Sequence, residues 1–239
     1  MAGRASTASE PPRGATGAHY GRIGVRSALA TGVCLGVAAG LPFWRALVVS
    51  TLPAYERAMF ETTPAAQIFP ALWPVVIVAG GVAWGWALAR ITGHPHARRL
   101  ALAGGMGVAV GYLLATAVVV PSFTSGFSTG QPPHVEFGII FVLATGVAAA
   151  VTGTALGVAV RSWQATASLT LAGGVGAAVP AALVAVCLDL LGMRVGSGDA
   201  AMPKVAALGF LAASLAVGAA MGLVLTRHIG RKAAHIPGR

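Results

Sequence analysis

The chain has 239 residues, of which 56% are hydrophobic and only 9% are charged. Soluble domains carry about 25% charged residues, so this composition excludes an ordinary water-soluble fold and predicts side chains that face lipid. The net charge of +10 sits in short clusters between apolar segments, which argues against a nucleic-acid partner and indicates contact with anionic lipid headgroups.

The predicted fold is all-α, a polytopic bundle of six transmembrane helices. Residues 1–22 lack apolar periodicity and predict a disordered basic tail; residues 23–228 form the membrane domain, and 229–239 a second basic tail. A signal peptide cleaved after Ala38-Ala-Gly40 is the alternative for the first segment, but the apolar run continues past it and favours a retained helix. The apolar segments all exceed the about 20 residues that a span requires: 23–49, 67–90, 99–121, 137–160, 166–191 and 204–226.

The distribution of basic residues predicts the orientation of the bundle. Of the 16 Lys and Arg residues, 12 fall in the two tails and the second and fourth connections, and four fall on the opposite side. Because basic loops stay in the cytoplasm, we expect a multi-pass protein of the cell membrane with both termini cytoplasmic.

Short motifs recur in alternate segments. The even-numbered segments contain G-x-A-x-G, at 81–85, 153–157 and 218–222, and the odd-numbered ones contain Leu-Ala-(Gly/Thr)-Gly, at 29–32, 102–105 and 171–174. The matches predict three tandem helical hairpins. Coincidence is the alternative, because 33 glycines make such matches frequent.

Many of these glycines lie four residues apart and hence on one helix face. Small residues let helices approach closely in lipid, where the hydrophobic effect contributes little to association. The sequence therefore predicts packing faces at Gly32, Gly36, Gly40, Gly81, Gly85, Gly107, Gly111, Gly153, Gly157, Gly218 and Gly222.

Few residues are candidates for chemistry. Asp189, near the outer end of the fifth segment, could line an outer vestibule, but a solvated residue at a helix end, paired with Arg194, is the favoured interpretation. His134 and Glu136 in the outer connection could join that vestibule; as metal ligands they are too few, and Glu136 suits a helix N-terminus. No metal or cofactor is predicted. Histidines are absent from the predicted spans, which argues against haem.

Catalytic signatures are also absent: the sequence has no P-loop, no H-E-x-x-H and no G-x-S-x-G. We therefore expect a protein that is not an enzyme. The first outer connection, 50–66, is compatible with a short interfacial helix.

Two functional hypotheses follow. The first is a non-enzymatic scaffold or subunit of a membrane complex, with itself or other membrane subunits as partners. The second is a small-solute permease or channel, including the membrane-embedded part of an importer, motivated by the repeats and weakened by the lack of polar residues at mid-membrane.

Overall fold

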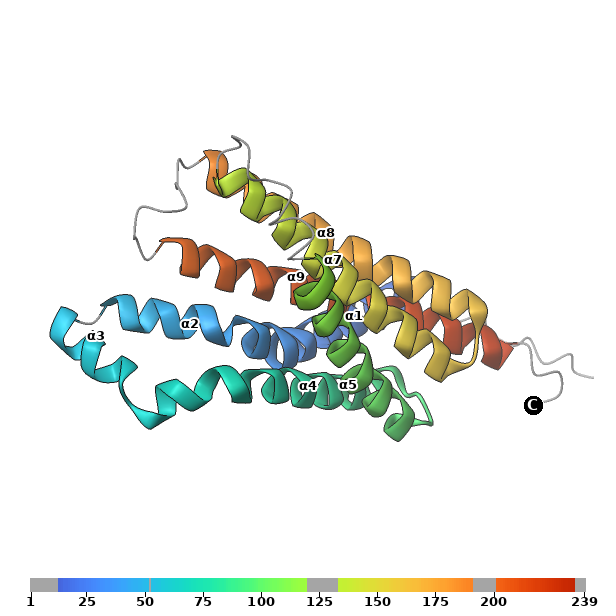
Figure 1. The fold of residues 1–239 in the computed structure, drawn as a ribbon. Coiled ribbons are helices and arrows are strands. Elements are labelled where there is room, and N and C mark those ends of the chain that lie inside the picture. The colour runs from blue at the N-terminus through green and yellow to red at the C-terminus, as the bar shows by residue number, and fades with distance from the viewer. Residues whose placement is uncertain (1–12, 52, 120–132, 191–200, 235–239) are drawn as a thin grey trace, which may run out of the picture.

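A computed structural model describes residues 13–51, 53–119, 133–190 and 201–234 of the chain (Figure 1). The described part is all-α, as predicted. One π-helical turn, which we call η1, separates α1 from α2, and a second, which we call η2, follows α5. The elements are α1 (Arg13–Thr31), η1 (Gly32–Gly36), α2 (Val37–Thr51), α3 (Ala54–Glu61), α4 (Pro64–Thr92), α5 (Ala97–Leu114), η2 (Ala115–Val119), α7 (Pro133–Val160), α8 (Trp163–Leu190) and α9 (Ala201–Ala234).

Six stretches of helix are long and apolar enough to cross a membrane, which confirms the predicted fold class. The first runs through α1, η1 and the start of α2, and the third through α5 and η2. Helix α3 lies in the connection where a short helix was expected. The apolar stretches are His19–Pro42, Ala66–Thr92, Ala97–Val119, Ile139–Val160, Trp163–Cys187 and Leu208–Ile229.

The helices are longer than predicted at both ends of the chain. Residues 13–22 are helical, which corrects the expectation of a tail without structure over 1–22, and α9 continues to Ala234, past the predicted limit of 228. Extending a formed helix adds one hydrogen bond per residue fixed, whereas starting one is costly, so polar residues continue a helix that the apolar segment has nucleated. His19 and His228 consequently lie in the terminal turns of spans, contrary to expectation. Residues 1–12 and 235–239 lie outside the described part.

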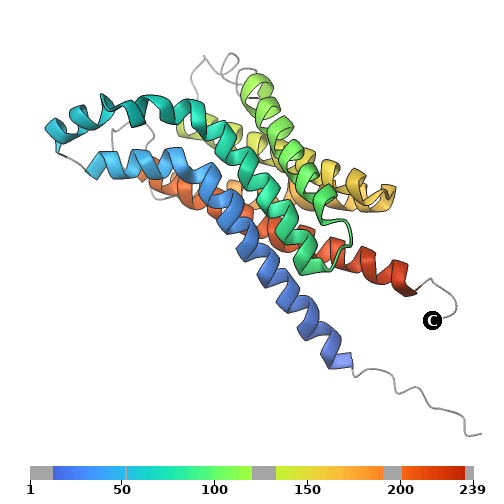
Figure 2. The same cartoon turned by 90° about the horizontal axis from the view of Figure 1, so that it is seen from below.

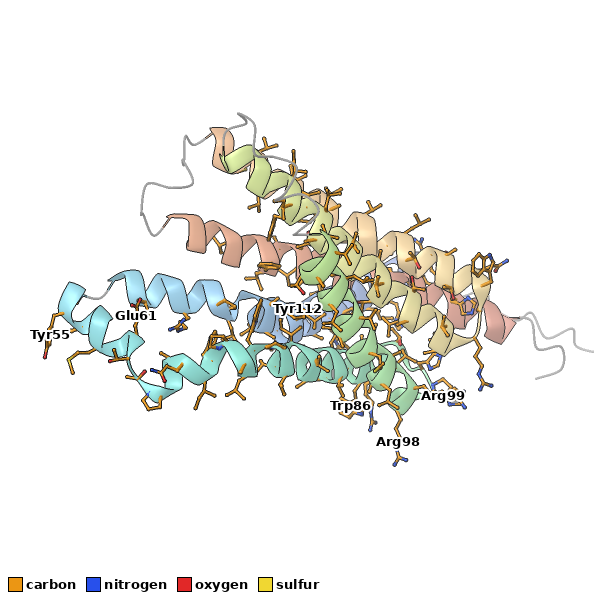
Figure 3. The ribbon with its side chains drawn as sticks, in the orientation of Figure 1. Tyr55, Glu61, Trp86, Arg98, Arg99 and Tyr112 are labelled. Carbon is orange, nitrogen blue, oxygen red and sulfur yellow. The ribbon has the colours of Figure 1, made fainter. Side chains whose placement is uncertain are left out.

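The bundle has two chemically distinct ends. One end, which we call the arginine end, carries the exposed residues Arg90, Arg98, Arg99, Arg161 and Arg227. The other, which we call the α3 end, carries Tyr55 and Glu61 (Figure 3). Helix α1 begins and α9 ends at the arginine end (Figure 2).

The helices follow one another around the bundle, and α9 returns to pack against α1. The closest contacts lie near the arginine end, where each G-x-A-x-G motif meets an odd-numbered span. A Cβ added at Gly85 would lie 2.8 Å from the carbonyl carbon of Leu100, and one at Gly157 would lie 2.7 Å from Thr166 Oγ1. Gly222 is similarly close to the side chain of Ser27. The intimate pairs are thus α4–α5, α7–α8 and α9–α1, each offset by one span from the predicted hairpins.

The sequence repeat extends to burial. Trp84, Leu156 and Met221 occupy the same position in the three G-x-A-x-G motifs, and all three are fully buried. Leu29, Leu102 and Leu171 begin the repeated motif of the odd spans, and they are 58%, 65% and 66% exposed. Each position therefore has the same environment in all three repeats. The motif of the even spans places a residue in the core, and the motif of the odd spans places a leucine on the outer surface.

An apolar cluster closes the arginine half of the bundle. It is centred on the buried residues of the three G-x-A-x-G motifs and on the equivalent residues one turn nearer the arginine end, which are Leu88, Val160 and Leu225. We call it the core cluster, and its main members are Trp84, Leu88, Leu100, Leu156, Val160, Leu169, Met221 and Leu225.

Candidate functional site

A partly open cavity of about 310 Å³ lies between the core cluster and the α3 end, and all six spans contribute to its wall. Functional pockets for small molecules occupy about 300–1,000 Å³. Along α4 the lining extends from Trp73 to Trp84, which is about 16 Å at 1.5 Å per residue. Trp84 is the lining residue of α4 nearest the arginine end, so the cavity ends on the core cluster there.

The cavity is built from equivalent positions of the repeat. Each of three sets contributes one residue per repeat, and every member of each set lines the cavity. The equivalent positions therefore surround a space near the centre of the bundle. The core cluster packs closely on the side of this space that faces the arginine end. The sets are Trp73, Thr145 and Phe210; Ile77, Ala149 and Ser214; and Leu35, Val108 and Ala177.

Aromatic side chains form two parts of the wall. Trp73 and Tyr112 meet edge to face with ring centroids 5.4 Å apart, and Phe141 and Phe210 do so at 4.8 Å. These separations lie in the preferred range for aromatic pairs. Tyr112 comes from α5, near the middle of the bundle (Figure 3). The wall thus offers rings against which an apolar or aromatic ligand could pack.

Trp73 is held in place by a second interaction. Pro42 has no amide proton, so the carbonyl of Ala38, four residues earlier, loses its usual helical partner. The indole Nε1 of Trp73 donates to this carbonyl at 2.9 Å. The bond satisfies a backbone group that lipid would leave unpaired, and it ties the first span to the second beside the cavity.

Hydroxyl groups line the cavity, but most of their protons are already used. Thr31, Thr116, Thr145 and Thr152 each donate to the carbonyl four residues earlier in their own helix, at 2.6–2.8 Å. Such bonds are the usual way for threonine to satisfy itself in an apolar helix. In this arrangement the four hydroxyls retain acceptor capacity, and their protons are engaged within their own helices.

Trp84 differs from these threonines. Trp84 is fully buried and is one of the residues of the cavity wall, and its Nε1 is buried without a hydrogen-bond partner among the described residues. A buried donor without a partner costs about 1–3 kcal/mol. Ser27 Oγ is also unpaired, but Ser27 lies in the contact between α1 and α9 and does not line the cavity.

Both π-helical turns border this cavity. Leu35 in η1 and Ala115 and Thr116 in η2 belong to its wall. A π turn inserts one residue into the helix and reorients the side chains after it, and such turns are frequent at functional sites. Both π-helical turns in the described part of the spans thus lie beside a cavity to which all six spans contribute.

The residues singled out from sequence lie elsewhere. His134 and Glu136 are in the first turn of α7 and Asp189 is next to the last residue of α8, by their place in the helices. Their side chains fall outside the described part of the chain, so the vestibule stays a prediction. Among the residues that the structure describes, no three His, Cys, Asp or Glu side chains form a group suited to a metal.

Comparison with known proteins found no matching family model, curated protein or solved structure. The six apolar helices are those of a multi-pass membrane protein. Sequence reasoning missed the cavity, because it sought charged groups in the spans and the lining is aromatic, aliphatic and hydroxylic. The signal that could have revealed it was Trp73 and Tyr112 inside apolar segments, away from the interfaces where such residues are usually enriched.

Proposed function

We propose that the protein is a membrane-embedded binding protein or permease for a small, predominantly apolar solute. The observation that supports this function is the cavity to which all six spans contribute and whose wall is mainly apolar and aromatic, with hydroxyl groups among it. Among the two hypotheses from sequence, it favours the permease over the scaffold. A scaffold requires close helix packing and has no need of an internal space, which forfeits dispersion contacts.

The lining also suggests the kind of solute. It contains no charged side chain, so a desolvated ion would find no compensating charge there. The core cluster closes the arginine end of the bundle, which disfavours a continuously open channel. A solute that enters from the α3 end, the predicted outer side, or from the lipid would stop at Trp84.

A binding experiment tests this function. The protein is placed in lipid nanodiscs and titrated with radiolabelled ethylnaphthalene, and empty discs give the partition into lipid. We expect saturable binding to the wild-type protein. Ala144→Phe, which places a ring in the cavity wall, should abolish it.

The matched control is Val158→Phe, a change in the same helix α7 at an exposed position outside the lining. This variant should bind like the wild type. Absence of a saturable component in the wild type, or equal loss in both variants, would contradict the proposed function.

A further inference from the structure

We propose that Trp84 is a specificity-determining hydrogen-bond donor, and that the cavity takes a small apolar molecule with one acceptor group, such as a carbonyl or an ether, at one end. The inference rests on the proposed function and adds the chemistry that the ligand must present. Trp84 lies at the end of the cavity nearest the core cluster. The ligand therefore points its acceptor group toward the core cluster, and its apolar body lies beside the aromatic pairs of the wall nearer the α3 end.

The two positions equivalent to Trp84 in the repeat carry no indole. The equivalent positions in the other two repeats are occupied by Leu156 and Met221, which are likewise fully buried in the core cluster. Both are wholly apolar, so the chain fills those two positions without a polar atom. At Trp84 the chain instead retains an N–H that pairs with nothing in the described structure, and a ligand acceptor would recover the cost of its desolvation.

The remaining groups of the wall define the rest of the ligand. The indole N–H of Trp73 is already bound to Ala38, and the four lining threonines donate within their own helices. An apolar body therefore matches most of the surface. The hydroxyls of Tyr112 and Ser214 also line the cavity, further toward the α3 end than Trp84.

The size of the ligand follows from the volume. Water occupies about 30 Å³ per molecule in the liquid, so a cavity of about 310 Å³ has room for on the order of ten to fifteen non-hydrogen atoms. A two-ring compound of this size fits the length of the lining. It also fits the aromatic wall, where edge-to-face contacts are favourable.

A matched pair of probes tests the donor. Acetylnaphthalene carries a carbonyl acceptor, and ethylnaphthalene has nearly the same shape without it. Binding of both is measured in nanodiscs for the wild type and for Trp84→Phe, which keeps an aromatic ring and removes the N–H. We expect the variant to lose affinity for the ketone about tenfold and for the hydrocarbon less than twofold.

A spectroscopic readout supports the assignment without relying on affinity. With 15N-labelled tryptophan, the indole N–H resonance that disappears in Trp84→Phe belongs to Trp84. In the wild type this resonance should move downfield with acetylnaphthalene and stay in place with ethylnaphthalene.

The outcomes separate the two proposals. If both probes bind and Trp84→Phe weakens them equally, or if the indole resonance ignores the ketone, the donor role is overturned and the binding function stands. If neither probe binds saturably to the wild type, the proposed function fails and the donor role fails with it.

Discussion

At the scale of single residues, two tryptophans of the interior differ in whether their indole N–H is hydrogen-bonded to a backbone carbonyl. Pro42 frees one carbonyl, that of Ala38, and Trp73 binds it from the neighbouring span. Trp84 has the same donor group but no hydrogen-bond partner in the part of the chain that the structure describes. Two tryptophans of α4, both among the residues of the cavity wall, thus differ: the indole of Trp73 joins two spans through a hydrogen bond, and the indole of Trp84 is buried without a partner among the described residues.

The role of Trp73 can be measured. Trp73→Phe should lower the free energy of unfolding by about 1–3 kcal/mol, because a carbonyl in an apolar environment loses its donor. In the background of Pro42→Ala, the new amide at position 42 can donate to Ala38 in the normal helical pattern, so the same substitution should cost less. Unfolding in mixed micelles with increasing dodecyl sulfate provides the double-mutant cycle.

Trp86→Phe is the matched control, since Trp86 is half exposed and lies outside the cavity wall. It should change stability by less than about 0.5 kcal/mol. Equal effects of Trp73→Phe with and without Pro42 would show that the freed carbonyl does not explain the contribution of Trp73.

At the scale of elements, the repeat organises close approach at the arginine end. Gly81 and Gly85 in α4 face the backbone of α5 at Gly104 and Leu100. Gly153 and Gly157 in α7 face α8, and Gly218 and Gly222 in α9 face α1. Glycine at these positions leaves room for a neighbouring backbone. That these contacts drive association of the helices stays a prediction.

Gly85→Ala tests that prediction. Its new Cβ would lie 3.0 Å from the Cα of Ala101 and still closer to the Leu100 carbonyl group, which is backbone and cannot rotate away. We expect a loss of about 1–3 kcal/mol in the free energy of unfolding, typical of overpacking. The same micellar titration measures it.

Gly21→Ala controls for the change in helix propensity. Gly21 lies in α1 with no atom within 4 Å of an added Cβ, so alanine should leave stability unchanged or raise it by up to about 1 kcal/mol. A Gly85→Ala protein as stable as Gly21→Ala would mean that the close approach contributes nothing.

The elements were largely predictable from sequence, and their pairing and the site were not. Apolar length alone located all six spans, because a lipid-facing helix needs both length and apolarity. The G-x-A-x-G motifs also marked equivalent positions correctly. The cavity escaped prediction because it arises where Trp73, Thr145 and Phe210 from three repeats surround a common space, and no local pattern encodes the separation of helices that are distant in sequence.

At the scale of the whole molecule, the two ends differ in charge and define a direction. Exposed arginines gather at one end, and α3 with Tyr55 and Glu61 lies at the other. Trp86 and Arg90 near the arginine end make a cation–π contact, with the guanidinium carbon 5.0 Å from the ring centroid. An aromatic ring beside a basic group suits the headgroup region of a membrane.

Site-directed labelling tests the predicted orientation. Cys34 and Cys187 are replaced by alanine, and a single cysteine is introduced at Tyr55 in α3 or at Trp163, the first residue of α8; both side chains are exposed. If the arginine end is cytoplasmic, as the excess of basic residues predicts, a membrane-impermeant maleimide should label Tyr55→Cys in intact cells. It should label Trp163→Cys only after permeabilisation, and the reverse pattern would invert the topology. Because the cavity lies on the α3 side of the core cluster, this result also decides the compartment nearer to the binding site: the predicted orientation makes it the outside, as solute capture for import requires.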